Sequence, residues 1–231
     1  GKPQVQITLI QCRPLGTIKE SVYLLPQNVP LKDQIFSGKS IVSGGSVQNV
    51  HYILYVPPEA YFSISNSAER NKLERAIGKL NAALADETFI CVGPGRWGTS
   101  NPDLGVHVDY GDIYNAKALV ELTGGSVGIP DEPSLGTHFF QDLLEGQIYP
   151  IAVNLDKDKF QREFFEASPN HLSDWITPEA GLETRLRLIQ VSDASLNSHL
   201  DLVIDDATGQ ALAFLVHEHE ISSEGRQVIV P

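Results

Sequence analysis

The chain has 231 residues, of which 42% are hydrophobic and 20% charged, and its 29 acidic residues outnumber its 17 basic ones, for a net charge of −12. This composition is typical of a folded domain and excludes the disordered and membrane-embedded classes. Because a negative field repels polyanions, we expect neither nucleic acid nor a membrane as a partner of the protein.

The sequence also predicts a compartment. It contains no run of 18 apolar residues and does not begin with the charged start and apolar run of a signal peptide. Its two cysteines, Cys12 and Cys91, are too few for a disulfide framework. We therefore expect a soluble, cytoplasmic protein. Because the sequence has no methionine, we also expect it to be a piece of a longer protein.

The first half of the chain predicts short strands followed by one long helix. Residues Leu73 to Leu84 carry apolar side chains at steps of four, three and four, which places these side chains on one face of a helix. Asn66, with Glu69 three residues later, is a capping pattern for the start of that helix. Runs of β-branched and aromatic residues bounded by proline or glycine predict strands, which in chain order are 5–10, 22–25, 40–42 and 51–56.

The second half of the chain mixes strands and short helices. Strands are expected at 88–92, 118–122, 148–153 and 184–191, and helices at 138–144 and 156–166. Alternating apolar residues at 200–204 and 212–216 flank a five-residue loop that ends at Gly209, which predicts a β-hairpin. Without strict alternation of strand and helix, the pattern favours an α/β or α+β fold with a mixed β-sheet, a few flanking helices and this C-terminal hairpin.

The densest cluster of candidate binding residues follows the strand at 88–92. Its glycines let backbone N–H groups approach a ligand, its arginine offers a fork of donors suited to a carboxylate or phosphate, and its hydroxyls add further donors. Its tryptophan is placed to stack on a ligand or cover it. The candidates are Gly93, Gly95, Arg96, Trp97, Thr99 and Ser100. The loop has neither common phosphate-loop pattern, and a structural turn with a core tryptophan is the alternative interpretation.

A second candidate pair, Thr137 and His138, stands at the entrance to the helix expected at 138–144. Backbone N–H groups, a hydroxyl and an imidazole at a helix start can bind an anion. The alternative is that Thr137 only caps the helix and His138 bonds to backbone. We predict that Arg96 and His138 face one pocket and together bind a small anionic ligand.

Two further groups contain metal-ligand residue types, but we expect no metal at either. His107 and Asp109 share a face if the chain is extended there, with Asp103 nearby in sequence. His217 and His219 share the face of a strand but have no third ligand nearby in sequence. The alternative to a metal is that these polar residues are simply solvated. Catalytic residues remain unassigned, since no nucleophile elbow or other hydrolase motif is present.

Two segments resemble a known family. Residues 9–14 read Leu-Ile-Gln-Cys-Arg-Pro, which is similar to the Gln-x-Arg-Pro end of the ATP-grasp nucleotide-binding domain in phosphoenolpyruvate synthase and pyruvate phosphate dikinase. In that family the Gln and Arg lie beside the nucleotide phosphates, which implies nucleotide binding for Gln11 and Arg13. The segments 93–100, 112–113 and 136–141 resemble the region after that domain, over about residues 40–215.

The resemblance implies a domain division and a kinase context. Residues 1–16 would be the terminal strand of a preceding ATP-grasp domain, and 17–231 an accessory α/β domain that has this ATP-grasp domain as its partner. The parent enzyme would use ATP and magnesium to phosphorylate a small acid such as pyruvate, with no cofactor evident for this piece. We expect Gln11 and Arg13 to be exposed or half-exposed on an edge strand here, because the domain they would contact is missing.

The chain also departs from the family. The body of the ATP-grasp domain is missing, and the Gly-Gly pair at 44–45 precedes His51 by five residues instead of the three of the phosphohistidine signature. We therefore give His51 no catalytic role. The expected function is that of an accessory domain that binds a phosphate or carboxylate ligand and does not turn over ATP alone. The alternative is a structural or partner-docking domain with no ligand site.

Overall fold

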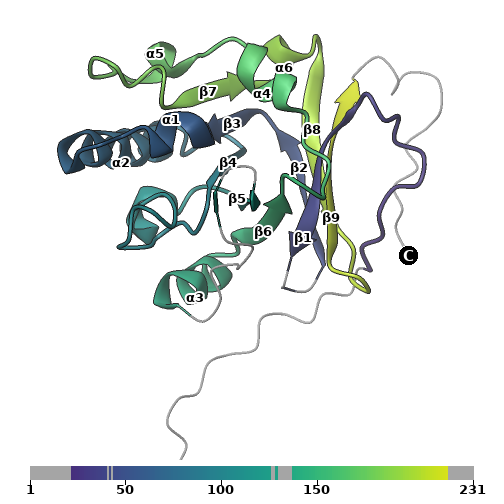
Figure 1. Ribbon diagram of the computed structural model, residues 1–231. Helices are drawn as coiled ribbons and strands as arrows, with labels where there is room; N and C mark the ends of the chain where they lie inside the picture. Colours follow the sequence, from purple (N-terminus) through teal and green to yellow (C-terminus); the bar gives the residue numbers. More distant parts are fainter. Residues whose placement is uncertain (1–21, 41, 43, 126–127, 130–136, 218–231) are drawn as a thin grey trace, which may run out of the picture.

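The computed structural model describes residues 22–40, 42, 44–125, 128–129 and 137–217 (Figure 1). Within these ranges nine strands form one mixed sheet in the order β2-β8-β9-β1-β6-β5-β4-β3-β7, which confirms the predicted fold class. The strands are β1 (Gln34–Ser40), β2 (Gly45–Val50), β3 (Tyr52–Tyr55), β4 (Phe89–Pro94), β5 (Ala118–Thr123), β6 (Tyr149–Asn154), β7 (Arg187–Gln190), β8 (Ser198–Ile204) and β9 (Gln210–His217).

The centre of the sheet is parallel and its two sides are antiparallel. Strands β3, β4, β5 and β6 run in one direction, whereas β7 pairs antiparallel with β3, and β1 pairs antiparallel with β6. Strands β8 and β9 form the predicted C-terminal hairpin. Since parallel strands need crossover connections, the helices within residues 58–145 fall between β3 and β6 along the chain, whereas the remaining helices follow β6. The carboxyl ends of the parallel strands lie at one edge of the sheet.

Six α-helices and one 3₁₀ helix accompany the sheet in the described ranges. They are α1 (Pro58–Phe62), α2 (Ser67–Ala83), η1 (Tyr110–Asp112), α3 (His138–Glu145), α4 (Arg162–Ala167), α5 (Leu172–Trp175) and α6 (Val191–Ala194). The predicted long helix is α2, and the side chain of Asn66 caps it by accepting a hydrogen bond from the Glu69 N–H at 2.9 Å. Within the described residues, none of these helices has the length and apolar character needed to cross a bilayer.

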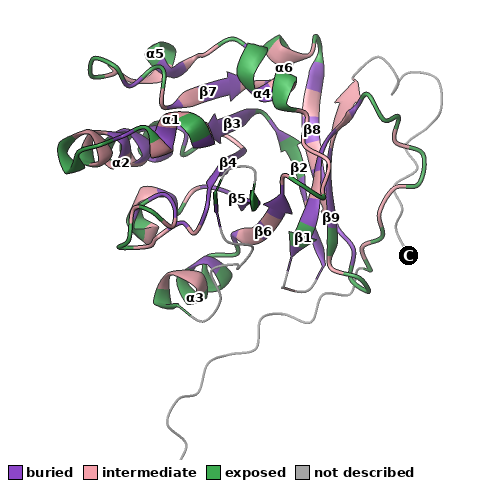
Figure 2. Ribbon diagram, in the orientation of Figure 1, coloured by how far each residue is buried: buried purple, intermediate pink, exposed green. Residues whose placement is uncertain are grey.

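The strands β3 and β4 separate two hydrophobic cores. Successive strand residues point to opposite faces, so Leu54 and Cys91 belong to the core beneath α1, α2 and α3, whereas Ile53 and Ile90 belong to the core inside the curve of the sheet. Every residue of β4 is buried (Figure 2). Burial of Cys91 also raises the pKa of its thiol and makes it a poor nucleophile.

Several predicted elements have different bounds in the structure. Residues 22–25 form no strand, and β1 ends at Ser40, so only the first residue of the strand expected at 40–42 lies in a strand. Val42 lies in a bend, and residue 41 lies outside the described residues. The helix expected at 156–166 is the shorter α4, because side-chain hydrogen bonds within 154–158 hold a turn before it. The strand expected at 184–191 is confined to β7. The strand expected at 5–10 and the proposed division at residue 16 lie outside the described residues.

Candidate functional site

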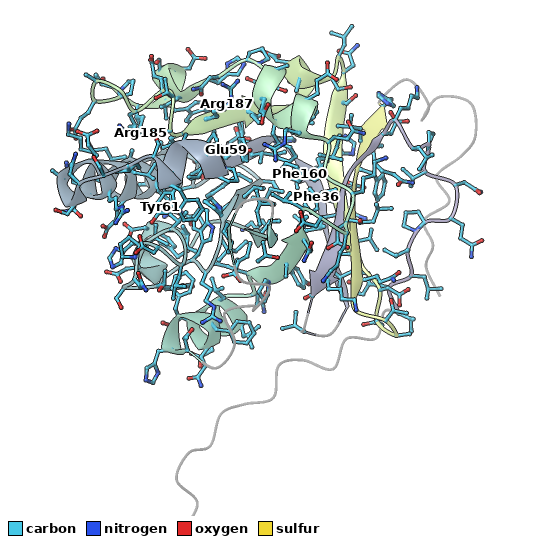
Figure 3. The ribbon with its side chains drawn as sticks, in the orientation of Figure 1. Phe36, Glu59, Tyr61, Phe160, Arg185 and Arg187 are labelled. Atoms are coloured by element: carbon cyan, nitrogen blue, oxygen red, sulfur yellow. The ribbon has the colours of Figure 1, made fainter. Side chains whose placement is uncertain are left out.

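The first candidate cluster lies where β4 ends at the carboxyl edge of the parallel strands. After Pro94 the chain forms a loop that closes on itself through a bridge between Gly95 and Gly105. The hydroxyl of Tyr61, from α1, donates to the carbonyl of Gly105 at 2.6 Å (Figure 3 shows Tyr61 on α1). The 95–105 loop is therefore attached to both β4 and α1. In open α/β sheets, ligands bind at this edge.

The backbone N–H groups of the loop do not form the cradle that the sequence predicts. The four consecutive N–H groups from Gly95 to Gly98 all donate to acceptors of the chain itself, at 2.8 to 3.0 Å. Their acceptors are the carbonyls of Leu122, Leu104 and Val106 and, for Trp97, the carboxylate of Glu121. Since each amide carries a single hydrogen, these groups stabilise the turn and are not directed at a ligand.

Close packing accounts for the glycines of the loop. A Cβ at Gly95 would lie 1.9 Å from the carbonyl oxygen of Leu104, and the φ of Gly95 is +64°. A Cβ at Gly93 would lie 2.7 Å from the ring of Trp97. These residues are glycines because backbone or ring occupies the space of a side chain, which is the structural interpretation left open by the sequence.

Trp97 lies in the core beneath α1, α2 and α3, which we call the first core, the core inside the curve of the sheet being the second. It is 1% exposed and packs over Gly93, and its indole Nε1 has no hydrogen-bond partner among the described residues. A ring in this position packs in the core and does not reach the surface to stack on a ligand there, which agrees with the alternative interpretation of a structural turn with a core tryptophan. The buried carboxylate of Glu121, 7% exposed, accepts the Trp97 N–H and orients the turn.

The polar side chains of the loop are more accessible. Arg96 and Thr99 are half-buried and Ser100 is exposed. The Thr99 hydroxyl oxygen accepts the N–H of Asn101 at 3.2 Å, which leaves its hydrogen able to be donated, since a hydroxyl both donates and accepts. An anion at this loop would therefore be bound by side chains.

The second cluster lies against the first. A Cβ at Gly98, whose φ is +73°, would lie 2.4 Å from the ring of Phe139, so the loop packs directly on the first turn of α3. Thr137 caps this helix by accepting the N–H of Phe140 at 3.1 Å, and His138 is exposed. The contact between Gly98 and Phe139 brings together two clusters that are about forty residues apart in the sequence.

An acidic cluster that the sequence did not predict lies between α2 and η1. Ligand oxygens of Glu74, Asp109 and Asp112 lie within 4.8 Å of one another. Asp109 and Asp112 cap η1 reciprocally, with the Asp109 N–H donating to Asp112 at 2.9 Å, and His107 bonds to Glu74 at 3.2 Å. Glu74 was missed because it is remote in sequence from the other two. The three carboxylates therefore form a cluster here, and each of them already accepts a hydrogen bond or forms an ion pair within the chain.

The remaining sequence candidates do not join these clusters. Asp103 lies 3.9 Å from Arg70, and His217 bonds to Ser198 and Asp33. His219, Gln11 and Arg13 lie outside the described residues. A pocket of about 220 Å³ beside α3 is lined by Tyr110, Asp142, Glu145 and Gly146, and its carboxylates disfavour an anion.

Comparison with known proteins does not assign the chain to a family. No family model, curated protein or solved structure matches the chain. The chemistry of the site therefore follows from its own residues: one guanidinium, three hydroxyls and one imidazole, supported by a rigid turn and the first turn of α3.

Proposed function

We propose that this chain is an accessory domain of a phosphoenolpyruvate synthase-like kinase, and that it binds a small carboxylate or phosphate where the 95–105 loop meets α3. The observation that supports an anion site is the contact of Gly98 with Phe139. Arg96 is two residues from Gly98, a span of at most about 7 Å along the chain, and His138 is next to Phe139. The kinase context and a cytoplasmic location rest on the resemblance and on composition.

The proposed site binds through side chains. Arg96 supplies the permanent charge and a fork suited to two oxygens of one anion, while Thr99, Ser100 and Thr137 supply hydroxyl hydrogens. His138 adds positive charge when it is protonated. Because the backbone N–H groups of the turn already have acceptors, we expect binding to be modest and to weaken as salt is added.

The chain alone is proposed not to hydrolyse ATP or to form phosphoenolpyruvate. ATP and magnesium belong to the parent enzyme, whose ATP-grasp body this sequence does not contain. ATP turnover by the purified chain above the rate of a buffer blank would contradict this part of the proposal.

Thermal denaturation with phosphate, pyruvate, phosphoenolpyruvate or ATP tests the anion site. We expect at least one of these anions to raise the melting temperature of the wild type, Arg96→Ala to abolish that rise, and Arg96→Lys to restore part of it. The matched control is Arg75→Ala, which removes an arginine of α2 that lies 3.2 Å from Glu179 in the loop before β7. If Arg75→Ala and Arg96→Ala reduce the rise equally, the anion does not bind at the loop.

A structural or partner-docking domain is the second candidate, and one observation favours it. The glycines at 93 and 95 and the N–H groups of the turn are all accounted for by internal contacts. Under this alternative none of the four anions changes the melting temperature, and Arg96→Ala lowers the stability of the chain whether or not an anion is present.

A further inference from the structure

Three polar side chains meet at one end of three neighbouring strands, away from the 95–105 loop in the sequence. Ser198 is the first residue of β8, His217 the last residue of β9, and Asp33 directly precedes β1. These strands are adjacent in the sheet, in the order β8-β9-β1, and Ser198 and His217 face each other across the hairpin. The Ser198 Oγ lies 2.8 Å from His217 Nδ1, and His217 Nε2 lies 3.0 Å from Asp33 Oδ1.

The partners determine where the hydrogens lie. An ionised aspartate only accepts hydrogen bonds, so Nε2 of His217 carries the hydrogen and donates it to Asp33. In the neutral ring Nδ1 is then an acceptor, and the Ser198 hydroxyl donates to it. The result is a chain in which serine donates to histidine and histidine donates to aspartate. These are the relationships of a Ser-His-Asp catalytic triad, with the two ring nitrogens exchanged.

The surroundings favour this direction of hydrogen bonding. The other neighbours of Ser198 Oγ are the Ser195 hydroxyl at 3.2 Å and the Leu196 carbonyl at 3.3 Å, both more distant than the imidazole. Asp33 and Ser198 are each 6% exposed, which strengthens their electrostatic interactions because little water screens them. The side chain of His217 is 30% exposed, and Leu196, in the turn before β8, is 82% exposed, so the imidazole reaches the surface beside the buried Ser198.

From this geometry we propose that Ser198 is an activated nucleophile that reacts with small carboxylic esters, independently of the anion site. His217 is the general base and Asp33 is a positioning residue that fixes the tautomer and orientation of the ring. The attraction between a buried carboxylate and an imidazolium stabilises the protonated ring that forms as serine loses its proton.

The reaction balances with water as the only co-reactant. Ser198 Oγ forms a bond to the ester carbonyl carbon while its proton moves to Nδ1 of His217. The tetrahedral adduct collapses, the bond to the leaving oxygen breaks, and the leaving alcohol takes the proton from Nδ1. Water then attacks the acyl-serine with Nδ1 as its base, which releases the carboxylic acid and returns the proton to Ser198.

A fluorophosphonate probe and p-nitrophenyl acetate test the proposal on the full chain. We expect the probe to add to Ser198, located by peptide mass spectrometry, and p-nitrophenyl acetate to be hydrolysed above the buffer rate. Ser198→Ala abolishes both, and His217→Gln lowers both by about a hundredfold, the usual contribution of a general base. The matched control is Ser195→Ala, which removes a neighbouring hydroxyl and retains both activities.

A role of this group in stability alone gives a different result. In that case the variants change the melting temperature without a matching effect on labelling. The proposal is overturned if Ser198 of the wild type remains unlabelled. It is also overturned if Ser198→Ala and Ser195→Ala are labelled equally. We expect Asp33→Asn to lower the rate at which the probe labels Ser198. Asp33→Glu should keep part of that rate, with the same thermal stability as Asp33→Asn. If His217→Gln fails to fold, acid provides the second test, since protonated imidazole cannot act as a base and labelling of the wild type must fall.

Discussion

At residue 95 the fold requires the absence of a side chain. Gly95 has a φ of +64°, and the atom nearest to an added Cβ is a backbone oxygen, that of Leu104 at 1.9 Å. A flexible side chain can move away from such a contact, but a loop held by a ladder of hydrogen bonds cannot. The constraint therefore combines an unfavourable backbone conformation with a clash that has no local relief.

We expect Gly95→Ala to lower the free energy of unfolding by more than about 2 kcal/mol, since a non-glycine residue in the left-handed region alone costs about 1–3 kcal/mol. Urea denaturation measures the change. The matched control is Gly111→Ala in η1, where an added Cβ would meet nothing within 4 Å, and the expected change is below about 1 kcal/mol. Equal losses at the two positions would show that the steric reason given for Gly95 is wrong.

At the residue scale, the sequence indicated a tight turn at 93–97 but not the direction in which its amide hydrogens point. The cluster of Gly, Arg and Trp at 93–97 is a constrained turn, as its composition indicates. A motif does not reveal whether amide hydrogens point outward or inward, because that depends on acceptors remote in sequence, here Leu122 and Glu121. Likewise, the burial of Trp97 depends on α1, α2 and α3 covering that face of the sheet.

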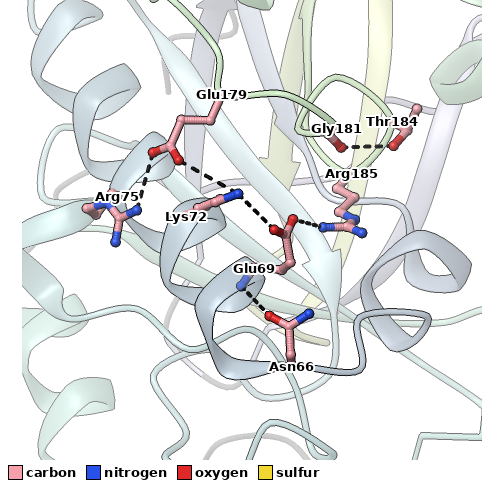
Figure 4. Close-up of polar contacts among 8 residues, drawn as sticks. All are labelled: Asn66, Glu69, Lys72, Arg75, Glu179, Gly181, Thr184 and Arg185. Atoms are coloured by element: carbon pink, nitrogen blue, oxygen red, sulfur yellow. Dashed lines mark hydrogen bonds and ion pairs between the residues drawn. The ribbon is translucent and has the colours of Figure 1, made fainter.

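On the scale of elements, a charged network connects α2 to the loop before β7. Glu69 accepts hydrogen bonds from Lys72, at 2.8 Å, and from Arg185, and Lys72 also approaches Glu179 (Figure 4). The hydrogen bonds from Lys72 and Arg185 hold the pKa of Glu69 below its ordinary value. Glu69 also lies in the first turn of α2, where a negative charge is favourable.

The sign of the pH effect follows from this lowered pKa. A carboxyl group that binds its proton less readily in the folded state than in the unfolded state stabilises the fold above its unfolded pKa, about 4.3. That stabilisation is lost as pH falls through the lower, folded-state pKa. We therefore expect Glu69→Gln to be less stable than the wild type at neutral pH and the difference to disappear in acid.

Thermal melts of both proteins between neutral and acidic pH measure this difference. Asp86→Asn, which neutralises an exposed carboxylate just after α2, is the matched control and should follow the wild type across the whole range. A gap between wild type and Glu69→Gln that stays constant down to strong acid would exclude the ion pairs as its source.

Elements with a strong periodic pattern of apolar residues were predicted well. Where the pattern is weak, contacts with neighbouring segments determine the structure that forms. The apolar steps and cap of α2 and the alternation of β8 and β9 predicted these elements correctly. Residues 22–25 have strand-forming residues, yet Tyr23 bonds to Asp206 of the hairpin loop and no strand forms. A turn built by side chains of 154–158 replaced the first half of a predicted helix, since local hydrogen bonds compete with the helical ladder.

For the whole molecule, the central strands belong to both hydrophobic cores at once. Leu80 of α2 lies in the first core and Leu202 of β8 in the second, and both are fully buried. Since β3 and β4 contribute alternate side chains to each core, neither core can be exposed without disturbing strands that the other requires. We infer that the described part of the chain unfolds as one cooperative unit.

Leu80→Ala and Leu202→Ala test this inference, and each is expected to lower the free energy of unfolding by about 2–5 kcal/mol. Both tryptophans, Trp97 and Trp175, belong to or pack against the first core, so their fluorescence reports on that side, whereas far-ultraviolet circular dichroism reports on all elements. Cooperative unfolding requires Leu202→Ala to shift both signals to the same midpoint. A fluorescence midpoint that stays at the wild-type value would indicate two independently unfolding parts.

The sequence by itself determined the fold class, the long helix, the C-terminal hairpin and the positions where the chain turns sharply. Such features depend on local periodicity, capping and glycine placement, which are physical properties of short segments. It also singled out the loop at 93–100 and the start of the helix at 138, and it led to the prediction that Arg96 and His138 face one pocket, without the contact that joins the two segments.

Only the tertiary structure decided which of these residues meet. The contact of Gly98 with Phe139, the carboxylate cluster between α2 and η1, and the chain from Ser198 through His217 to Asp33 each join segments that are far apart in sequence. Their distances follow from strand order and helix packing, which depend on how whole faces bury apolar surface against one another. No pattern within a short window of residues contains that information.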